Sequence, residues 1–246
     1  LGTTGETPVL TKEEKKYIET RTRVDLRDVS GSMASQFRQS RKSKAEIAMN
    51  AHLKFLEMRR GKNDRTAFWL FSDDPYPVQE NFIVDDELYF LKAFDAPWEL
   101  GTMEIDYWTE EQWGRYLIPK SRILQVAGQG GTELSPILKA VIQLFDDDEK
   151  KQKKSSYYGS KGRSILIVTD AAIADFDQTK PDFEKLSKRK IIPYIIFIDE
   201  SAGEQNSDQL ANIPKLLQEV VARGGRFFPV SDEKAIENAY REIDKL

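Results

Sequence analysis

The sequence has 246 residues, with no cysteine and a single histidine, His52. The lack of cysteine excludes disulfides, zinc–thiolate centres and thiol catalysis, and is compatible with the cytosol or a bacterial envelope. One histidine leaves most catalytic triads without a base. His52 has no evident serine or aspartate partner nearby, so we interpret it as a structural residue on the first helix.

Long apolar runs are also missing. No segment is long enough to cross a bilayer, and no signal peptide is visible. The net charge of −4, from 37 basic and 41 acidic residues, is too balanced to indicate nucleic acid as a main partner. A hydrophobic content of 39% and a charged content of 32% are typical of a soluble domain with a core.

Predicted strands alternate with predicted helices along most of the chain. This order indicates βαβ units and therefore an α/β fold: a doubly wound, mostly parallel sheet with helices on both faces. We predict strands at 23–28, 66–71, 82–84, 164–169, 191–198 and 226–228, and helices at 43–60, 133–145, 181–190, 213–223 and 232–246. Ser135 and Pro136 suit the N-cap and first position of the second helix.

Three stretches depart from this alternation. Residues 1–20 begin with a Gly-, Thr- and Pro-rich segment, and we interpret them as a flexible leader or a remnant of cloning, before one domain at 21–246. Residues 95–121 hold Trp98, Trp108 and Trp113 and form an aromatic-rich insert, which either packs on the body or anchors a partner. Residues 146–162 run from acidic to basic and are expected to form a solvated loop.

The most informative segment is Asp28-Val29-Ser30-Gly31-Ser32-Met33, directly after the first strand. A carboxylate and two hydroxyls at alternate positions can direct three oxygens at one small volume. Downstream, Thr132 adds a hydroxyl after Gly130-Gly131, and Asp170 adds a carboxylate after an apolar strand. Oxygen donors at the carboxyl ends of parallel strands suit a hard divalent cation. The alternative reading of Asp-x-Ser-x-Ser is a capped turn.

These motifs, in this order, resemble the metal-ion-dependent adhesion site of von Willebrand factor type A (vWA) domains. The resemblance covers about nine-tenths of the chain and implies the Rossmann-like vWA fold. It implies that Ser30, Ser32 and Thr132 bind the ion through hydroxyls, and that Asp28 and Asp170 bind it directly or through water. It also implies Mg²⁺, with Mn²⁺ or Ca²⁺ as alternatives, and a free position for an Asp or Glu of a protein partner.

Within the family, several details resemble bacterial Bat-type (aerotolerance) proteins. They are the Asp28–Met33 motif, Asp64-Arg65, Phe71-Ser72-Asp73, Gly130-Gly131-Thr132, and the endings Gly224–Phe228 and Ile243–Leu246. Such proteins usually have membrane helices beside the domain. The resemblance thus implies a soluble domain from a parent chain that is membrane-anchored in the bacterial cell envelope, through segments absent from this sequence.

One departure from the family concerns the first strand. In vWA domains the strand at this position is normally apolar throughout, whereas Asp25 and Arg27 interrupt this one. Arg27 lies beside Asp28 and would weaken cation binding, unless strand alternation directs it to the opposite face. The favoured hypothesis is a cation-dependent protein-binding module that is not an enzyme. A metal-dependent phosphoesterase and a metal-free vWA scaffold stay open as alternatives.

Overall fold

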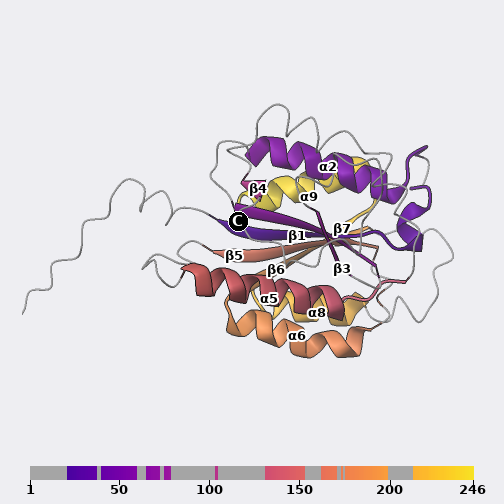
Figure 1. Ribbon diagram of the computed structural model, residues 1–246. Helices are drawn as coiled ribbons and strands as arrows, with labels where there is room; N and C mark the ends of the chain where they lie inside the picture. Colours follow the sequence, from indigo (N-terminus) through magenta and orange to yellow (C-terminus); the bar gives the residue numbers. More distant parts are fainter. Residues whose placement is uncertain are drawn as a thin grey trace, which may run out of the picture.

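A seven-stranded sheet forms the centre of the molecule (Figure 1). The computed structural model describes residues 21–37, 40–59, 65–72, 75–78, 103–104, 131–152, 162–170, 173, 175–198 and 213–246. The strands follow the order β3-β2-β1-β5-β6-β7, with β4 also paired to β2. The parallel strands are β1 (Thr22–Asp28), β2 (Arg65–Phe71), β5 (Arg163–Thr169), β6 (Ile191–Ile198) and β7 (Arg226–Val230). Short β3 (Pro75–Val78) and β4 (Met103–Glu104) run antiparallel to β2.

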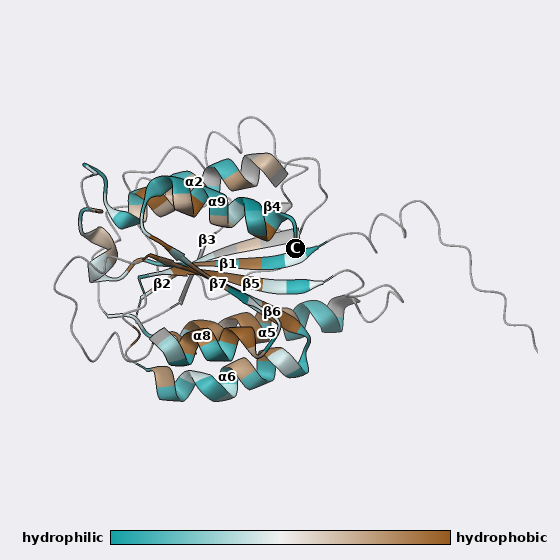
Figure 2. Cartoon of the chain, turned by 180° about the vertical axis from the view of Figure 1, so that it is seen from behind, coloured by the Kyte–Doolittle hydropathy of each residue, from teal (hydrophilic) through white to brown (hydrophobic). Residues whose placement is uncertain are grey.

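Helices cover both faces of the sheet, as Figures 1 and 2 show from opposite sides. One face carries α2 (Lys44–Arg59) and α9 (Glu233–Asp244), and the other carries α5 (Ser135–Gln152), α6 (Phe176–Lys188) and α8 (Ile213–Val221). A 3₁₀ turn, η1 (Gly31–Ala34), connects β1 toward α2. This arrangement confirms the predicted doubly wound α/β fold.

Two hydrophobic cores lie on the two faces of the sheet. Val24 and Leu26 of β1 belong to the core that includes α5 and α6, whereas Leu166 and Val168 of β5 belong to the core with α2 and α9. In Figure 2 the middle of the sheet is hydrophobic, and the helices carry both hydrophobic and hydrophilic residues. The parallel strands are buried on both faces, which explains why 164–169 lacks polar alternation.

Arg23, Asp25 and Arg27 of β1 lie on the face covered by α2 and α9. Asp25 contacts Arg23 at 2.9 Å and His52 Nε2 at 3.3 Å, and Arg27 donates to Met49 Sδ at 3.1 Å. These side chains therefore find their partners within the molecule, as buried ionic groups require. Strand alternation directs Arg27 away from the partners of Asp28, as expected from the sequence.

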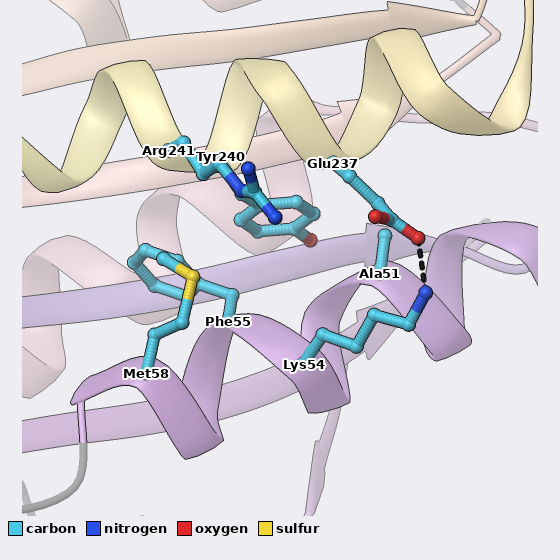
Figure 3. A pocket seen from close by; sticks show the side chains of 7 residues that line it. All are labelled: Ala51, Lys54, Phe55, Met58, Glu237, Tyr240 and Arg241. Atoms are coloured by element: carbon cyan, nitrogen blue, oxygen red, sulfur yellow. Dashed lines mark hydrogen bonds and ion pairs between the residues drawn. The ribbon is translucent and has the colours of Figure 1, made fainter.

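Helices α2 and α9 pack closely over this face (Figure 3). The rings of Phe55 and Tyr240 lie with centroids 5.0 Å apart, and His52 stacks on Tyr240 at 6.0 Å. Lys54 and Glu237 form an ion pair across the two helices. They border a pocket of about 300 Å³, which contains none of the five predicted metal ligands. Its lining residues are Ala51, Lys54, Phe55, Met58, Glu237, Tyr240 and Arg241.

The prediction of a loop from residue 146 is wrong for its first part. Helix α5 does not end at 145 but continues to Gln152. Asp146 forms two hydrogen bonds with Arg189, at 2.6 and 2.8 Å, and Asp147 accepts hydrogen bonds from Gln143 and Lys150. The Asp147 pairs are at helical spacing and stabilise the helix itself, and the Asp146–Arg189 pair joins its end to α6. Composition alone indicates a solvated loop for this charged segment.

Helix α6 also differs from the prediction, since it begins at Phe176 and includes Pro181. Proline in a helix removes one hydrogen bond, but Phe176, Phe183 and Leu186 of this helix are buried. Their burial fixes the helix in spite of the proline. The predictions for 1–20, for the strand at 82–84, for 153–161 and for the aromatic-rich insert outside 103–104 lie outside the described residues. Among the described residues, no helix is both long and apolar enough to cross a membrane.

Candidate metal centre

Asp28, the last residue of β1, is the centre of the candidate site. Its side chain is fully buried, and Oδ1 accepts a hydrogen bond from the backbone N–H of Ser30 at 2.8 Å. Val29 N–H bonds to Phe71 O at 2.9 Å, which ties the turn to the neighbouring strand β2. The Oγ atoms of Ser30 and Ser32 lie 3.3 Å apart. The predicted motif therefore folds as one tight turn with its oxygens on the same side.

Two threonines contact the other carboxylate oxygen of Asp28. Thr132, directly before α5, donates to Oδ2 at 3.3 Å, and Thr169, the last residue of β5, donates at 2.7 Å. Strands β1 and β5 are parallel neighbours, so their carboxyl ends meet at one edge of the sheet. The predicted metal ligands included Thr132 but not Thr169. The position of Thr169 at the end of β5, directly before Asp170, is the sequence signal that could have identified it.

Asp170 completes the cluster and has a partner that sequence analysis missed. Lys44 Nζ, at the start of α2, lies 3.0 Å from Asp170 Oδ2, and the two side chains are 5% and 4% exposed. The other oxygen, Asp170 Oδ1, is buried with no hydrogen-bond partner among the described residues. No sequence signal connects Lys44 to the motif, because this pair joins residues 126 positions apart.

The two carboxylates of the cluster favour a bound cation. Burial raises the pKa of Asp28, and the nearby charge of Asp170 raises it further. A divalent cation between Asp28 and Asp170 would offset the repulsion that disfavours the ionisation of Asp28. Asp170 Oδ1, which is buried and has no hydrogen-bond partner in the part of the chain that the structure describes, is an oxygen that such an ion would satisfy. Together with the hydroxyls of Ser30, Ser32 and Thr132, the donor set is all oxygen and fits Mg²⁺.

The start of α5, which follows the Thr132 segment, is capped by a residue far away in the sequence. Asp175 accepts hydrogen bonds from the backbone N–H groups of Leu134 and Ser135 at 2.8 and 2.7 Å. Ser135, predicted as the N-cap, is the first helical residue, and its Oγ donates to Asp182 at 2.7 Å. The structure thus corrects the predicted cap, because a carboxylate near α6 satisfies the helix end instead.

Comparisons with known proteins identify the fold. No protein-family model and no curated protein matches the sequence. Among solved structures, BatB from Bacteroides thetaiotaomicron is 15% identical, with 92% of this chain and 99% of that chain covered and a TM-score of 0.51. A von Willebrand factor type A structure from Catenulispora acidiphila is 14% identical, with 92% and 42% covered and a TM-score of 0.57.

The chain has the von Willebrand factor type A fold. The open form of the pilus adhesin SpaC from Lactobacillus rhamnosus GG also matches, at 10% identity and a TM-score of 0.62, with 92% of this chain and 30% of SpaC covered. This chain therefore spans less than half of the vWA and SpaC chains and almost all of BatB. The predicted vWA and Bat-type resemblance is confirmed at the level of the fold.

Proposed function

We propose that this chain is a divalent-cation-dependent protein-binding module for adhesion or assembly, and not an enzyme. Asp28, Ser30, Ser32, Thr132 and Asp170 hold the cation, which is Mg²⁺, with Mn²⁺ or Ca²⁺ as alternatives. The ion keeps one coordination position for an Asp or Glu of a partner protein, so that it bridges the two proteins.

The observation that carries this proposal is the meeting of distant oxygen donors around Asp28. Thr132 Oγ1 lies 3.3 Å from Asp28 Oδ2 although the residues are 104 positions apart, and Asp170 is close enough to raise the pKa of Asp28. A capped turn would need only the local bond from Ser30 N–H. Among the described residues, Asp170 Oδ1 is buried without a hydrogen-bond partner, which supports a cation site over a purely structural network.

A surface position for the partner is available on the same turn. Ser32 is exposed, whereas Asp28, Ser30 and Thr132 are buried. The cation would thus be held from the protein side and accessible from the Ser32 side. SpaC is a pilus adhesin and BatB has the same fold, which supports an adhesion or assembly role in a bacterial envelope protein.

The test is calorimetric titration of the EDTA-treated protein with Mg²⁺ and Mn²⁺, with Asp28→Asn as the variant. Asp177→Asn is the matched control, because Asp177 is exposed on α6. We expect saturable binding that Asp28→Asn abolishes and Asp177→Asn retains. Equal binding by the Asp28→Asn protein would refute this site. Partner binding, once a partner is in hand, should be lost in EDTA and in Thr132→Ala.

A further inference from the structure

Lys44 is a cationic side chain placed inside the candidate metal centre. Its ammonium lies 3.0 Å from Asp170 Oδ2, and both side chains are almost fully buried. A buried ammonium needs a compensating anion, and Asp170 supplies that charge. Asp170 is at the same time one of the two carboxylates of the metal centre, so one carboxylate serves two cations.

The backbone holds Lys44 in this place. The Lys44 N–H donates to Ser35 O at 3.1 Å, and Ser35 is bonded through both its N–H and its Oγ to Ser32 O. Residue Ser32 belongs to the metal-binding turn. The start of α2 is therefore fixed directly to that turn, and the ammonium does not reach Asp170 by chance rotation of a surface lysine.

We propose that Lys44 is a built-in counter-ion that competes with the divalent cation for Asp170 and thereby sets a low affinity of the site for the metal. A unit positive charge a few ångströms from a divalent ion disfavours its binding strongly in a partly buried site. The two aspartates alone would neutralise a divalent ion, whereas with Lys44 the loaded site keeps a net positive charge.

The excess charge explains how an acidic partner is selected. A carboxylate of the partner removes the surplus positive charge, so that metal and partner bind more tightly together than either does alone. This inference rests on the proposed function, because it concerns the affinity of the same site. It adds that removal of the Lys44 charge increases metal affinity in the absence of a partner.

The experiment is Mg²⁺ and Mn²⁺ titration of the EDTA-treated chain, compared among wild type, Lys44→Gln, Lys44→Arg and Lys42→Gln. Glutamine keeps a hydrogen-bond donor for Asp170 but removes the charge, and arginine keeps the charge. Lys42 is the matched control because it is 42% exposed and paired with Glu233 of α9. Thermal unfolding verifies that each variant folds, and Lys44→Met replaces Lys44→Gln if the latter does not.

We expect Lys44→Gln to bind Mg²⁺ at least about tenfold more tightly than wild type, and the Lys44→Arg and Lys42→Gln changes to have little effect. Wild-type binding with unchanged or weaker binding by Lys44→Gln would overturn this inference and leave the proposed function intact. Binding by Lys44→Gln alone would support the inference, because the Lys44 charge then lowers the wild-type affinity for the metal below detection. Binding by neither protein would overturn both.

Discussion

Asp28 shows how one buried carboxylate connects separate parts of the chain. It accepts hydrogen bonds from Ser30 N–H, Thr132 Oγ1 and Thr169 Oγ1, and its side chain has no exposed surface. Without these donors, the buried carboxylate would lose its hydration and gain no hydrogen bonds to replace it. The same bonds orient its oxygens, as a cation site requires of its ligands.

Thr169→Val tests the shortest of these bonds at nearly constant volume. Loss of the 2.7 Å bond to Asp28 should lower the free energy of unfolding by about 2 kcal/mol, because the acceptor is a buried charged group. It should also weaken Mg²⁺ binding, since Asp28 is less well oriented. Denaturant unfolding and calorimetry measure the two effects.

Thr179→Val is the control for Thr169→Val. Thr179 is equally buried, and its Oγ1 bonds to Phe176 O at 2.6 Å within α6, a helix that carries none of the predicted ligands. It should cost stability, by about 1 kcal/mol, and leave Mg²⁺ binding unchanged. If both threonine variants bind Mg²⁺ like wild type, Thr169 has no role in orienting Asp28.

The buried pair of Asp25 and His52 makes the protein sensitive to acid. Burial lowers the pKa of His52 to about 4, in spite of the opposing effect of Asp25. Burial raises the pKa of Asp25, but Arg23 and His52 outweigh it and bring the value to about 2. Both groups therefore release protons more readily in the folded chain than in the unfolded chain.

The contribution of His52 to stability should be lost as the pH drops from about 6.5 to about 4, because the unfolded chain protonates His52 there and the folded chain does not. The contribution of Asp25 to stability is lost at lower pH, between its pKa of 3.8 in the unfolded chain and its pKa of about 2 in the folded chain. The measurement is urea unfolding across this range for wild type and His52→Gln. Relative to wild type, the variant should gain stability as the pH drops from about 6.5 to about 4, and an identical pH dependence of the two proteins would contradict the role of His52.

At the level of the elements, β1 places its buried ion-pair residues on one face of the sheet and its candidate metal ligand on the other. Asp25 and Arg27 pair with groups of α2 and its neighbours on one face, and Asp28 presents its oxygens to the segments before α5 and after β5. The period of two along a strand makes this separation automatic. Arg27 therefore need not weaken cation binding, although it is the direct neighbour of Asp28 in the sequence.

Asp175→Ala should destabilise the protein by about 2–3 kcal/mol, because two buried N–H groups at the start of α5 lose their acceptor. Asp232→Ala is the comparison, since Asp232 caps α9 through Ala235 N–H at an exposed end. That change should cost only about 1 kcal/mol. Denaturant unfolding of both variants tests the difference, and equal losses would show that Asp175 is no more than an ordinary cap.

At the scale of the whole molecule, the candidate ligands come together only when the sheet is formed. They lie at the ends of β1 and β5, in η1 and before α5, over residues 28–170. The unfolded chain has no such constellation, so a bound cation stabilises the folded state by mass action.

Mg²⁺ at 100 times its dissociation constant should therefore raise the free energy of unfolding by about 2.7 kcal/mol. Thermal unfolding in Mg²⁺ and in EDTA measures this difference. Asp28→Asn should show the same midpoint in both conditions. A wild-type midpoint that does not differ between Mg²⁺ and EDTA would argue against specific binding to the folded protein.

The sequence by itself determined the order of the five parallel strands and of the five helices, and the position of the Asp28–Met33 turn, because hydrophobic periodicity and turn chemistry are local properties. It did not predict the short antiparallel strands β3 and β4. It did not determine the length of α5, since Asp146 and Arg189 stabilise the charged end of that helix only after α5 and α6 pack together. Tertiary structure alone decided that Lys44 meets Asp170, that Thr169 meets Asp28, and that Asp175 caps α5. These contacts join residues 40 to 141 positions apart, and no periodicity of the chain specifies which buried polar groups will form hydrogen bonds with one another.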